Sequence, residues 1–228
     1  MEYFITGIDT DIGKTFVTKH LAYAFQKQGL KAGVYKPLQS GAQKTPAGLC
    51  APDIEAVKAL SKDINTKCSY IFEGEVSPAL AARLAGVKPD INKIKSDFNE
   101  FRKLNDITLI EGAGGLLAPM LDNMLCLDLI KKFNVPIIIV TAPFLGRLNH
   151  TLLTVRCALA ENVKIKGIIV NKAPVKTEDA ASNNFINELK MYTDVPILGV
   201  IRDLGADNKA IEAEFSQIIK SHGFAQNI

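Results

Sequence analysis

The sequence predicts an α/β domain that is doubly wound, with a mostly parallel sheet flanked by helices. Two observations predict this class. Short runs rich in β-branched residues alternate with helical patterns along the chain, which is the order expected of strands joined by crossover helices. Several of these runs, such as 136–140, are apolar at nearly every position, and such runs fit strands buried on both faces of a parallel sheet.

The individual elements follow from the same patterns. Strands are expected at 3–8, 32–36, 107–111, 136–141, 166–170 and 196–200. One side of the first helix is marked by Val17, Leu21, Ala24 and Gln28. Gly29 can end that helix, and Ser77 and Pro78 have the character of an N-cap and first residue of another helix, with Gly86 as its stop. Ligands of a doubly wound sheet bind at the carboxyl ends of its strands.

The composition limits the class further. The 228 residues, of which 47% are hydrophobic and 22% charged, fit one globular domain spanning 1–228. A net charge of +3 is too small to indicate a nucleic-acid or membrane partner, and neither a signal peptide nor a membrane-length apolar run is recognisable. The cysteines are scattered without metal-ligand spacing, so we expect a cytoplasmic protein with reduced thiols.

The segment from Gly7 to Thr15 lies between the first predicted strand and the first predicted helix. This context is the one that a phosphate-binding loop needs, although its second glycine comes one residue later than in the common motif. Backbone amides at the helix start point at the anion, Lys14 adds a positive charge, and the Thr15 hydroxyl can ligate Mg²⁺. The residues expected to contact the nucleotide here are Asp11, Ile12, Gly13, Lys14, Thr15 and Phe16. The fold is therefore predicted to be of the phosphate-loop NTPase type.

Three charged residues near other predicted strand ends could act on a bound phosphate. Glu111 ends an apolar strand and precedes the small-residue run 112–115, at the position where phosphate-loop enzymes keep a metal-binding acid. Lys36 also ends a strand, and it is either a charge stabiliser or a surface lysine. Asp53 begins a helical pattern, where an acid is favourable with or without a metal, so metal binding and a purely helical role are equally good interpretations.

Asn171 and Lys172 follow the strand 166–170 and resemble the base-reading Asn-Lys-x-Asp of GTP-binding proteins. Pro174 stands where the guanine-reading aspartate would be, so adenine is favoured over guanine. The alternative is an ordinary strand-ending asparagine in a turn.

Taken in order, these residues resemble the dethiobiotin synthetase family. The similarity runs from the phosphate loop, including its extra residue, to Asn171 and so covers most of the chain. It is carried by Gly7 to Thr15, Tyr35-Lys36-Pro37, Ser40-Gly41, Lys44-Thr45-Pro46, Asp53, Ser77-Pro78, Glu111 to Gly115, Leu145-Gly146 and Asn149-His150.

The resemblance implies an ATP-dependent cyclo-ligase of biotin biosynthesis, which forms dethiobiotin from 7,8-diaminononanoate, CO₂ and ATP. One amine takes up CO₂ as a carbamate, whose oxygen attacks the γ-phosphate. The second amine then attacks the carbamic–phosphoric mixed anhydride, and phosphate leaves. Lys14 and Lys36 are implied as the catalytic cations, and Thr15, Asp53 and Glu111 as the ligands of Mg²⁺.

The remaining contacts are also implied by the resemblance. Outside the phosphate loop, the nucleotide is expected to contact Asp53, Glu111, Gly112, Ala113, Gly114, Asn171 and Lys172. The substrate is expected to contact Thr10, Ser40, Gly114, Leu145, Gly146 and Asn149. The family further implies a homodimer with shared active sites, in which the segment from Gly146 to Asn149 lends backbone amides to the substrate carboxylate in the partner's site.

Two positions depart from the family pattern. The run Arg202-Asp203-Leu204 follows the last predicted strand and is expected to contact the nucleotide. Within it, Arg202 occupies the place of a proline that the family often has in a loop touching adenine. Ala79 replaces a histidine that often follows the Ser-Pro pair.

Three other functions are compatible with the fold. A related amide-forming ATP-dependent synthase usually carries a glutamine-hydrolysing domain, for which 228 residues leave no room. A positioning ATPase carries a lysine near the start of the loop, where this chain has Ile8-Asp9-Thr10. A non-catalytic regulatory nucleotide-binding domain would not need an intact Lys14, Thr15 and Glu111. Measuring ATP turnover with and without the diamine distinguishes these functions.

Overall fold

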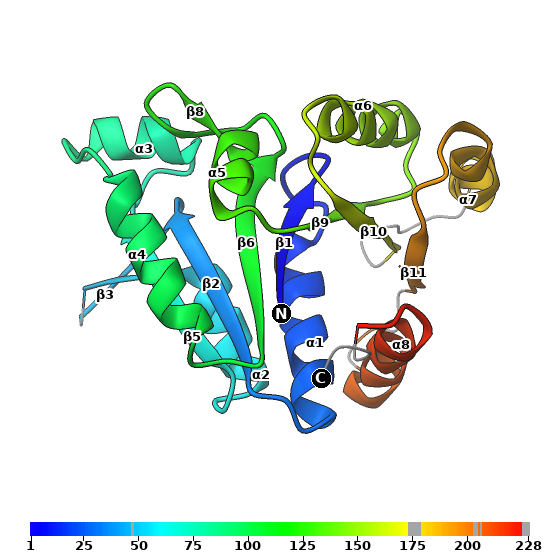
Figure 1. The fold of residues 1–228 in the computed structure, drawn as a ribbon, viewed down its shortest axis with the longest axis horizontal. Coiled ribbons are helices and arrows are strands. Elements are labelled where there is room, and N and C mark those ends of the chain that lie inside the picture. Colours follow the sequence, from blue (N-terminus) through cyan, green and yellow to red (C-terminus); the bar gives the residue numbers. More distant parts are fainter. Residues whose placement is uncertain (47, 173–178, 203–204, 206, 225–228) are drawn as a thin grey trace.

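A parallel sheet forms the centre of the protein in the computed structural model, which describes residues 1–46, 48–172, 179–202, 205 and 207–224 (Figure 1). Seven strands run in the order β11-β10-β9-β1-β6-β2-β5, and every neighbouring pair is parallel. They are β1 (Glu2–Gly7), β2 (Ala32–Gln39), β5 (Asn65–Ile71), β6 (Ile107–Gly115), β9 (Ile137–Thr141), β10 (Ile165–Asn171) and β11 (Ile197–Ile201). The predicted doubly wound α/β class is confirmed, and β1 lies where the strand order reverses, the usual place for a ligand.

Helices cover both faces of the sheet and enclose two separate hydrophobic clusters. One face carries α1 (Lys14–Lys27), α2 (Pro52–Leu60) and α8 (Asn208–Ser221). The other face carries α3 (Pro78–Leu84), α4 (Ile91–Arg102), α5 (Cys126–Phe133), α6 (Arg147–Ala160) and α7 (Ala180–Tyr192). Among the described residues, no helix has both the length and the apolar character needed to cross a membrane.

The helix boundaries follow local sequence signals. Gly29 and Gly86 both adopt positive φ, at 88° and 66°, just beyond α1 and α3, so the predicted stops are confirmed. Pro78 is the first residue of α3 and Ser77 its N-cap, also as predicted. The Asp90 carboxylate accepts a hydrogen bond from the backbone amide of Asn92 at 2.8 Å and so caps α4.

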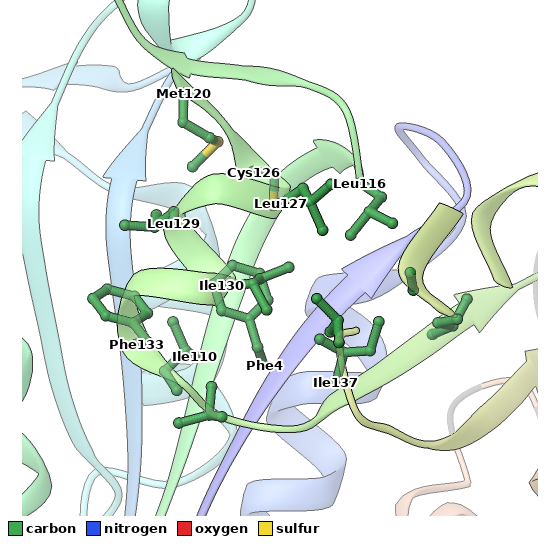
Figure 2. Close-up of a cluster of buried hydrophobic side chains, with 14 of the residues drawn as sticks. Phe4, Ile110, Leu116, Met120, Cys126, Leu127, Leu129, Ile130, Phe133 and Ile137 are labelled. Atoms are coloured by element: carbon green, nitrogen blue, oxygen red, sulfur yellow. The ribbon is translucent and has the colours of Figure 1, made fainter. Parts of the chain in front are cut away.

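Helix α5 shows how the sheet is covered. Its apolar side chains lie over Phe4 of β1, Ile110 of β6 and Ile137 of β9 (Figure 2). Phe133, the last residue of α5, lies 4.5 Å from Phe98 of α4 and 6.4 Å from Phe4, measured between ring centroids. The aromatic side chains therefore join two helices to the centre of the sheet.

The structure adds elements that the sequence patterns do not indicate. Strand β5 is half-buried, and its sequence NTKCSYI is largely polar, so it lacks the continuous apolar signal of the central strands. Two short hairpins, β3 (Gln43–Thr45) with β4 (Gly48–Cys50) and β7 (Pro119–Leu121) with β8 (Met124–Leu125), also lie outside the prediction.

Two of the predicted strand ends are wrong. Strand β2 continues to Gln39 and β6 continues to Gly115, so Lys36 and Glu111 lie inside strands and do not end them. The extensions form because β5 pairs with β2 up to Gln39, and β1 pairs with β6 as far as Gly7 opposite Gly115. Strand β6 therefore reaches the start of the phosphate loop.

We expect Phe133→Ala to lower the free energy of unfolding by about 3–5 kcal/mol, because it removes a buried aromatic side chain from a closely packed cluster. Leu104, whose side chain is 64% exposed, provides the control, since Leu104→Ala should change stability by no more than about 0.5 kcal/mol. Urea denaturation of the two variants measures the difference. Equal stability losses would contradict the assignment of Phe133 to the core.

Candidate active site

A cleft of 880 Å³ opens beside the phosphate loop. The predicted site residues that line it are Thr10, Asp11, Gly13, Lys14, Thr15, Lys36, Ser40, Asp53, Glu111, Ala113 and Gly114. The cleft also contains residues that the sequence analysis did not assign to the site, namely Gln39, Gly41, Glu75, Val76, Ser77, Pro78 and Ala118. Half of the predicted residues thus converge on one cleft, from the loop that follows β1, from β2 and β6, and from the starts of α1 and α2.

The end of β10 holds the phosphate loop in place. The buried side chain of Asn171 donates a hydrogen bond from Nδ2 to the carbonyl oxygen of Ile12 at 3.1 Å. Gly13 adopts φ 89°, and a Cβ atom built there would lie 2.0 Å from Asn171 Nδ2. Only glycine therefore fits at this position, both for its backbone angle and for its contact with Asn171.

Lys14 lies almost buried at the start of α1. Its Nζ donates to the carbonyl oxygen of Asp9 at 2.8 Å. Burial and the nearby charge of Lys36 lower the pKa of Lys14, because both disfavour its charged form. An anion in the loop would relieve this unfavourable environment.

Lys36 forms the electrostatic centre of the cleft. Its buried Nζ lies 2.5 Å from Asp53 Oδ2 and 3.0 Å from Glu111 Oε1, and it donates to the Gly112 carbonyl oxygen at 2.9 Å. Burial opposes its charge, but the Glu111 and Asp53 carboxylates outweigh that effect and raise the pKa of Lys36. Lys36 is thus a buried cation held by two carboxylates, which excludes the interpretation as a surface lysine.

The side-chain oxygens of Thr15, Asp53 and Glu111 lie close together and could hold a hard cation. The Thr15 hydroxyl lies 2.8 Å from Asp53 Oδ1 and 2.8 Å from Glu111 Oε1, yet its single proton can satisfy only one of them. Glu111 Oε2 is buried and accepts no hydrogen bond from the described residues. Burial raises the pKa of Glu111 against the effect of Lys36, so a cation beside Glu111 would favour its ionised form.

This ligand set fits Mg²⁺. Oxygen donors suit a hard cation, and Mg²⁺ is usually bound through one or two carboxylates together with substrate phosphates. Within the described ranges, no group of three or more His, Cys, Asp or Glu side chains could hold a metal ion. The remaining ligands of a bound Mg²⁺ would come from nucleotide phosphates or water.

A second ion pair joins the phosphate loop to α6. Arg147 Nη1 lies 2.6 Å from Asp9 Oδ2 and 3.2 Å from His150 Nδ1. The hydrogen bond from Arg147, assisted by the backbone amide of Thr10, lowers the pKa of Asp9. Arg147 is the first residue of α6, so this pair sets the start of α6 relative to the loop.

Other predicted residues lie outside the cleft. Ile12 and Phe16 pack into the core around α1, and the Cβ position of Gly112 is filled by Phe4, 2.8 Å away. The exposed residues Leu145, Gly146 and Asn149 surround the start of α6, and they do not line the cleft of their own chain.

The predicted base-binding residues also lie beyond the cleft. Asn171 contacts the phosphate loop, and the Lys172 backbone amide donates to the Ile201 carbonyl oxygen at 2.7 Å. Arg202 donates through Nε to Glu214 Oε1 of α8 at 2.6 Å. Pro174, Asp203 and Leu204 lie outside the described residues.

The fold and the site define a phosphate-loop nucleotide-binding protein. A family model described as an AAA domain matches residues 1–206. Among solved structures, the septum site-determining protein MinD of Pyrococcus horikoshii, in complex with Mg-ADP, has a TM-score of 0.62 at 18% identity, covering 97% of this chain and 96% of MinD. A plasmid partition protein of Borrelia burgdorferi has a TM-score of 0.63 at 13% identity, covering 100% of this chain and 98% of that protein. At these identities the likeness extends to the fold alone.

Sequence relatives are more specific. An ATP-dependent dethiobiotin synthetase BioD of Halalkalibacterium halodurans is 36% identical over 202 residues, 87% of this chain and 83% of that protein. The protein of the same name from Bacillus cereus is 33% identical over 233 residues, 99% of this chain and 95% of that protein. The chain belongs to the dethiobiotin synthetase family.

We expect Glu111→Gln to raise the Mg²⁺ concentration needed for half-maximal ATP turnover at least tenfold while leaving the fold intact. The amide removes a metal-binding charge, and Lys36 keeps its pair with Asp53. The exposed Asp63→Asn provides a control of equal charge change. Magnesium titrations and thermal melting measure the two effects. A collapse of the melting temperature with an unchanged Mg²⁺ requirement would make Glu111 a structural residue.

Proposed function

We propose that this protein is an ATP-dependent dethiobiotin synthetase, which converts 7,8-diaminononanoate, CO₂ and ATP to dethiobiotin, ADP and phosphate. The observation that carries the proposal is the convergence of Lys14, Thr15, Lys36, Asp53 and Glu111 on one cleft, in a chain similar over most of its length to proteins of that name. The same similarity supports a small-molecule substrate.

The phosphoryl-transfer step requires positioning and charge neutralisation more than covalent help. Lys14, at the start of α1, is proposed to contact the phosphates, and Lys36, which is paired with Asp53 and Glu111, is proposed as the second catalytic cation. Thr15, Asp53 and Glu111 would hold Mg²⁺, which supplies positive charge to the phosphate oxygens when bound. Because these groups are fixed before the reaction, they cost little reorganisation as charge develops.

The substrate reacts through its own two amines. One amine takes up CO₂ as a carbamate, the carbamate oxygen attacks the γ-phosphorus, and ADP leaves. The second amine attacks the carbamic–phosphoric anhydride carbon, so that a C–N bond forms as phosphate leaves and the amine loses a proton. Thr10, Ser40 and Gly114 line the cleft beside Lys36 and are proposed to contact the diamine or its carbamate.

The nucleotide base is proposed to lie near the ends of β10 and β11, in contact with Asn171, Lys172 and the loop from Arg202 to Leu204. The absence of a guanine-reading aspartate after Lys172 favours adenine. We further propose that one domain, 1–228, carries the activity, and that the protein works in the cytoplasm, where its free cysteines would stay reduced.

The direct test is mass spectrometry of the products formed from diaminononanoate, ¹³C-bicarbonate and MgATP. One ¹³C atom should appear in dethiobiotin for each ADP formed. An amide-forming synthase, a positioning ATPase or a regulatory domain would give no labelled cyclic urea, so such a result would reject the proposal.

We expect Lys14→Ala to lower kcat/KM because it removes a preorganised hydrogen-bond donor. The loss should correspond to at least about 3 kcal/mol of transition-state stabilisation. Lys19, which is on the same helix and outside the cleft, provides the control as Lys19→Ala. Steady-state kinetics with saturating Mg²⁺ measure both variants. Turnover by Lys14→Ala near the wild-type level would exclude the proposed role of the loop.

We also propose a homodimer with shared active sites. The start of α6 exposes Leu145 at 86% and Phe144 at 37% of their surfaces, and a helix N-terminus is a favourable place for an anion. Gly146 adopts φ 83°, and no atom of the described residues lies within 4 Å of a Cβ built there. In this arrangement, Gly146 to Asn149 of one subunit bind the substrate carboxylate in the cleft of the other.

We expect two inactive variants, Lys14→Ala and Gly146→Asp, to restore activity when mixed. Random exchange makes half of the dimers mixed, and each mixed dimer has one intact site and one doubly damaged site, so activity should approach about a quarter of wild type. Size-exclusion chromatography with two tags checks that subunits exchange. Exchange without recovered activity would place both residues in the same site.

A further inference from the structure

We propose that Gln39 and Glu75 form a subsite for an ammonium group on the side of the cleft built by the segments that follow β2 and β5. This inference rests on the proposed function, and it assigns the subsite to one of the two amines of the diamine. Both residues line the cleft, and neither belongs to the phosphate loop or to the proposed metal ligands.

Gln39 offers a buried acceptor. Its side chain is 6% exposed, and its Nε2 donates to the Ser40 carbonyl oxygen at 2.8 Å, which fixes the orientation of the amide group. Its Oε1 accepts no hydrogen bond from any residue of the described ranges. Buried acceptors are normally paired, so this oxygen is suited to a ligand that donates a hydrogen bond.

Glu75 offers a negative charge at the same wall. No ion pair or hydrogen bond engages its carboxylate within the described part of the chain, whereas the neighbouring Glu73 pairs with Lys44 at 2.9 Å outside the cleft. Of these two acids, Glu75 lines the cleft, and it is also the one without an ion pair among the described residues.

The backbone holds the two residues close together. The Phe72 amide donates to the Gln39 carbonyl oxygen at 2.8 Å, and the Gly41 amide donates to the Gly74 carbonyl oxygen at 2.9 Å. A Cβ atom built on Gly41 would lie 3.3 Å from Glu75 Cγ. The side chain of Glu75 thus packs against a residue two positions after Gln39, just beyond the last paired residues of β2 and β5, which are Gln39 and Ile71.

The chemistry of the subsite selects its ligand. An amide oxygen and a carboxylate both accept hydrogen bonds, and an ammonium group has three donors and no acceptor. An alkyl amine is charged at neutral pH, as lysine is, whereas a phosphate or carboxylate would be repelled by Glu75. The Asp53 and Glu111 carboxylates are engaged by Lys36 and Thr15, so Glu75 is the acid left on this wall.

The subsite orients the substrate. Lys14 and Lys36 repel an ammonium group, while Glu75 attracts it and repels the carboxylate at the other end of the diamine. The amine end therefore enters toward Gln39 and Glu75. The ammonium group held there loses one proton to solvent before its nitrogen attacks the anhydride carbon, and a second proton as the ring closes. Glu75 acts as a binding and orienting residue in this scheme.

The test compares Glu75→Gln with the matched control Glu73→Gln. Calorimetry measures the Kd of diaminononanoate and of the two monoamines, 7-aminononanoate and 8-aminononanoate, and steady-state kinetics measure the KM for ATP. We expect Glu75→Gln to raise the Kd of the diamine about three- to tenfold, as for loss of a partly exposed charge-assisted hydrogen bond. The KM for ATP and the Glu73→Gln variant should match wild type.

The two monoamines show which of the two amines the subsite binds. The effect of Glu75→Gln should vanish with the monoamine that lacks the amine held by the subsite and persist with the other. A Gln39→Met variant should weaken diamine binding in the same direction, with folding checked by thermal melting.

Three outcomes would overturn the inference. In the first, the Glu75→Gln and Glu73→Gln variants bind the diamine equally well; in the second, Glu75→Gln weakens the binding of both monoamines. In the third, Asp11→Asn weakens diamine binding specifically and Glu75→Gln does not. Dethiobiotin formation by the wild type is scored separately, so a failed subsite leaves the proposed function standing. A wild type that does not bind the diamine would reject both.

Discussion

The site depends on one buried ammonium group. Lys36 Nζ, inside the central region of the sheet, contacts Asp53 of α2, Glu111 of β6 and the Gly112 carbonyl oxygen, and Thr15 of α1 adds contacts to both acids. Residues of β2, α2, β6 and α1 thus meet around the Lys36 ammonium group. Removing Lys36 would leave two buried carboxylates without a counter-charge, which costs several kcal/mol, whereas removing one carboxylate leaves Lys36 paired with the other. The positions of the Asp53 and Glu111 oxygens therefore depend on Lys36.

Two further contacts fix the phosphate loop from the other side. Asn171 of β10 binds the Ile12 carbonyl oxygen, and Arg147 of α6 binds the Asp9 carboxylate. The loop is consequently held by residues more than a hundred positions away in sequence, on the side of β1 where β9 and β10 lie. The glycines and the lysine of the loop are features of the local sequence. The position of the loop relative to Lys36, in contrast, depends on these remote contacts.

The sequence predicts the central sheet well because buried parallel strands have an unmistakable apolar signal. It also predicts that Lys14, Thr15 and Glu111 share one site, and the three residues line the same cleft; the loop and the acid after an apolar run have recognisable spacing. It misses β5, whose edge position permits polar residues, and it ends β2 and β6 too early, because strand extension depends on pairing partners. The sequence does not indicate that Gln39 and Glu75 lie near each other, because hydrogen bonds between separate segments bring them together. The contact of Asn171 with Ile12 is also tertiary and has no local sequence signal.

The place of β1 at the centre of the sheet has a consequence for synthesis on the ribosome. Its neighbours are β6 and β9, so β1 has no partner in the sheet until Ile107–Gly115, and then Ile137–Thr141, have emerged. At ordinary elongation rates of about 5–20 residues per second, the apolar strand waits roughly five seconds or more. During this interval the nascent chain exposes an unpaired hydrophobic edge, which makes it a natural client for chaperones that bind nascent chains and leaves the phosphate loop among the last parts to form.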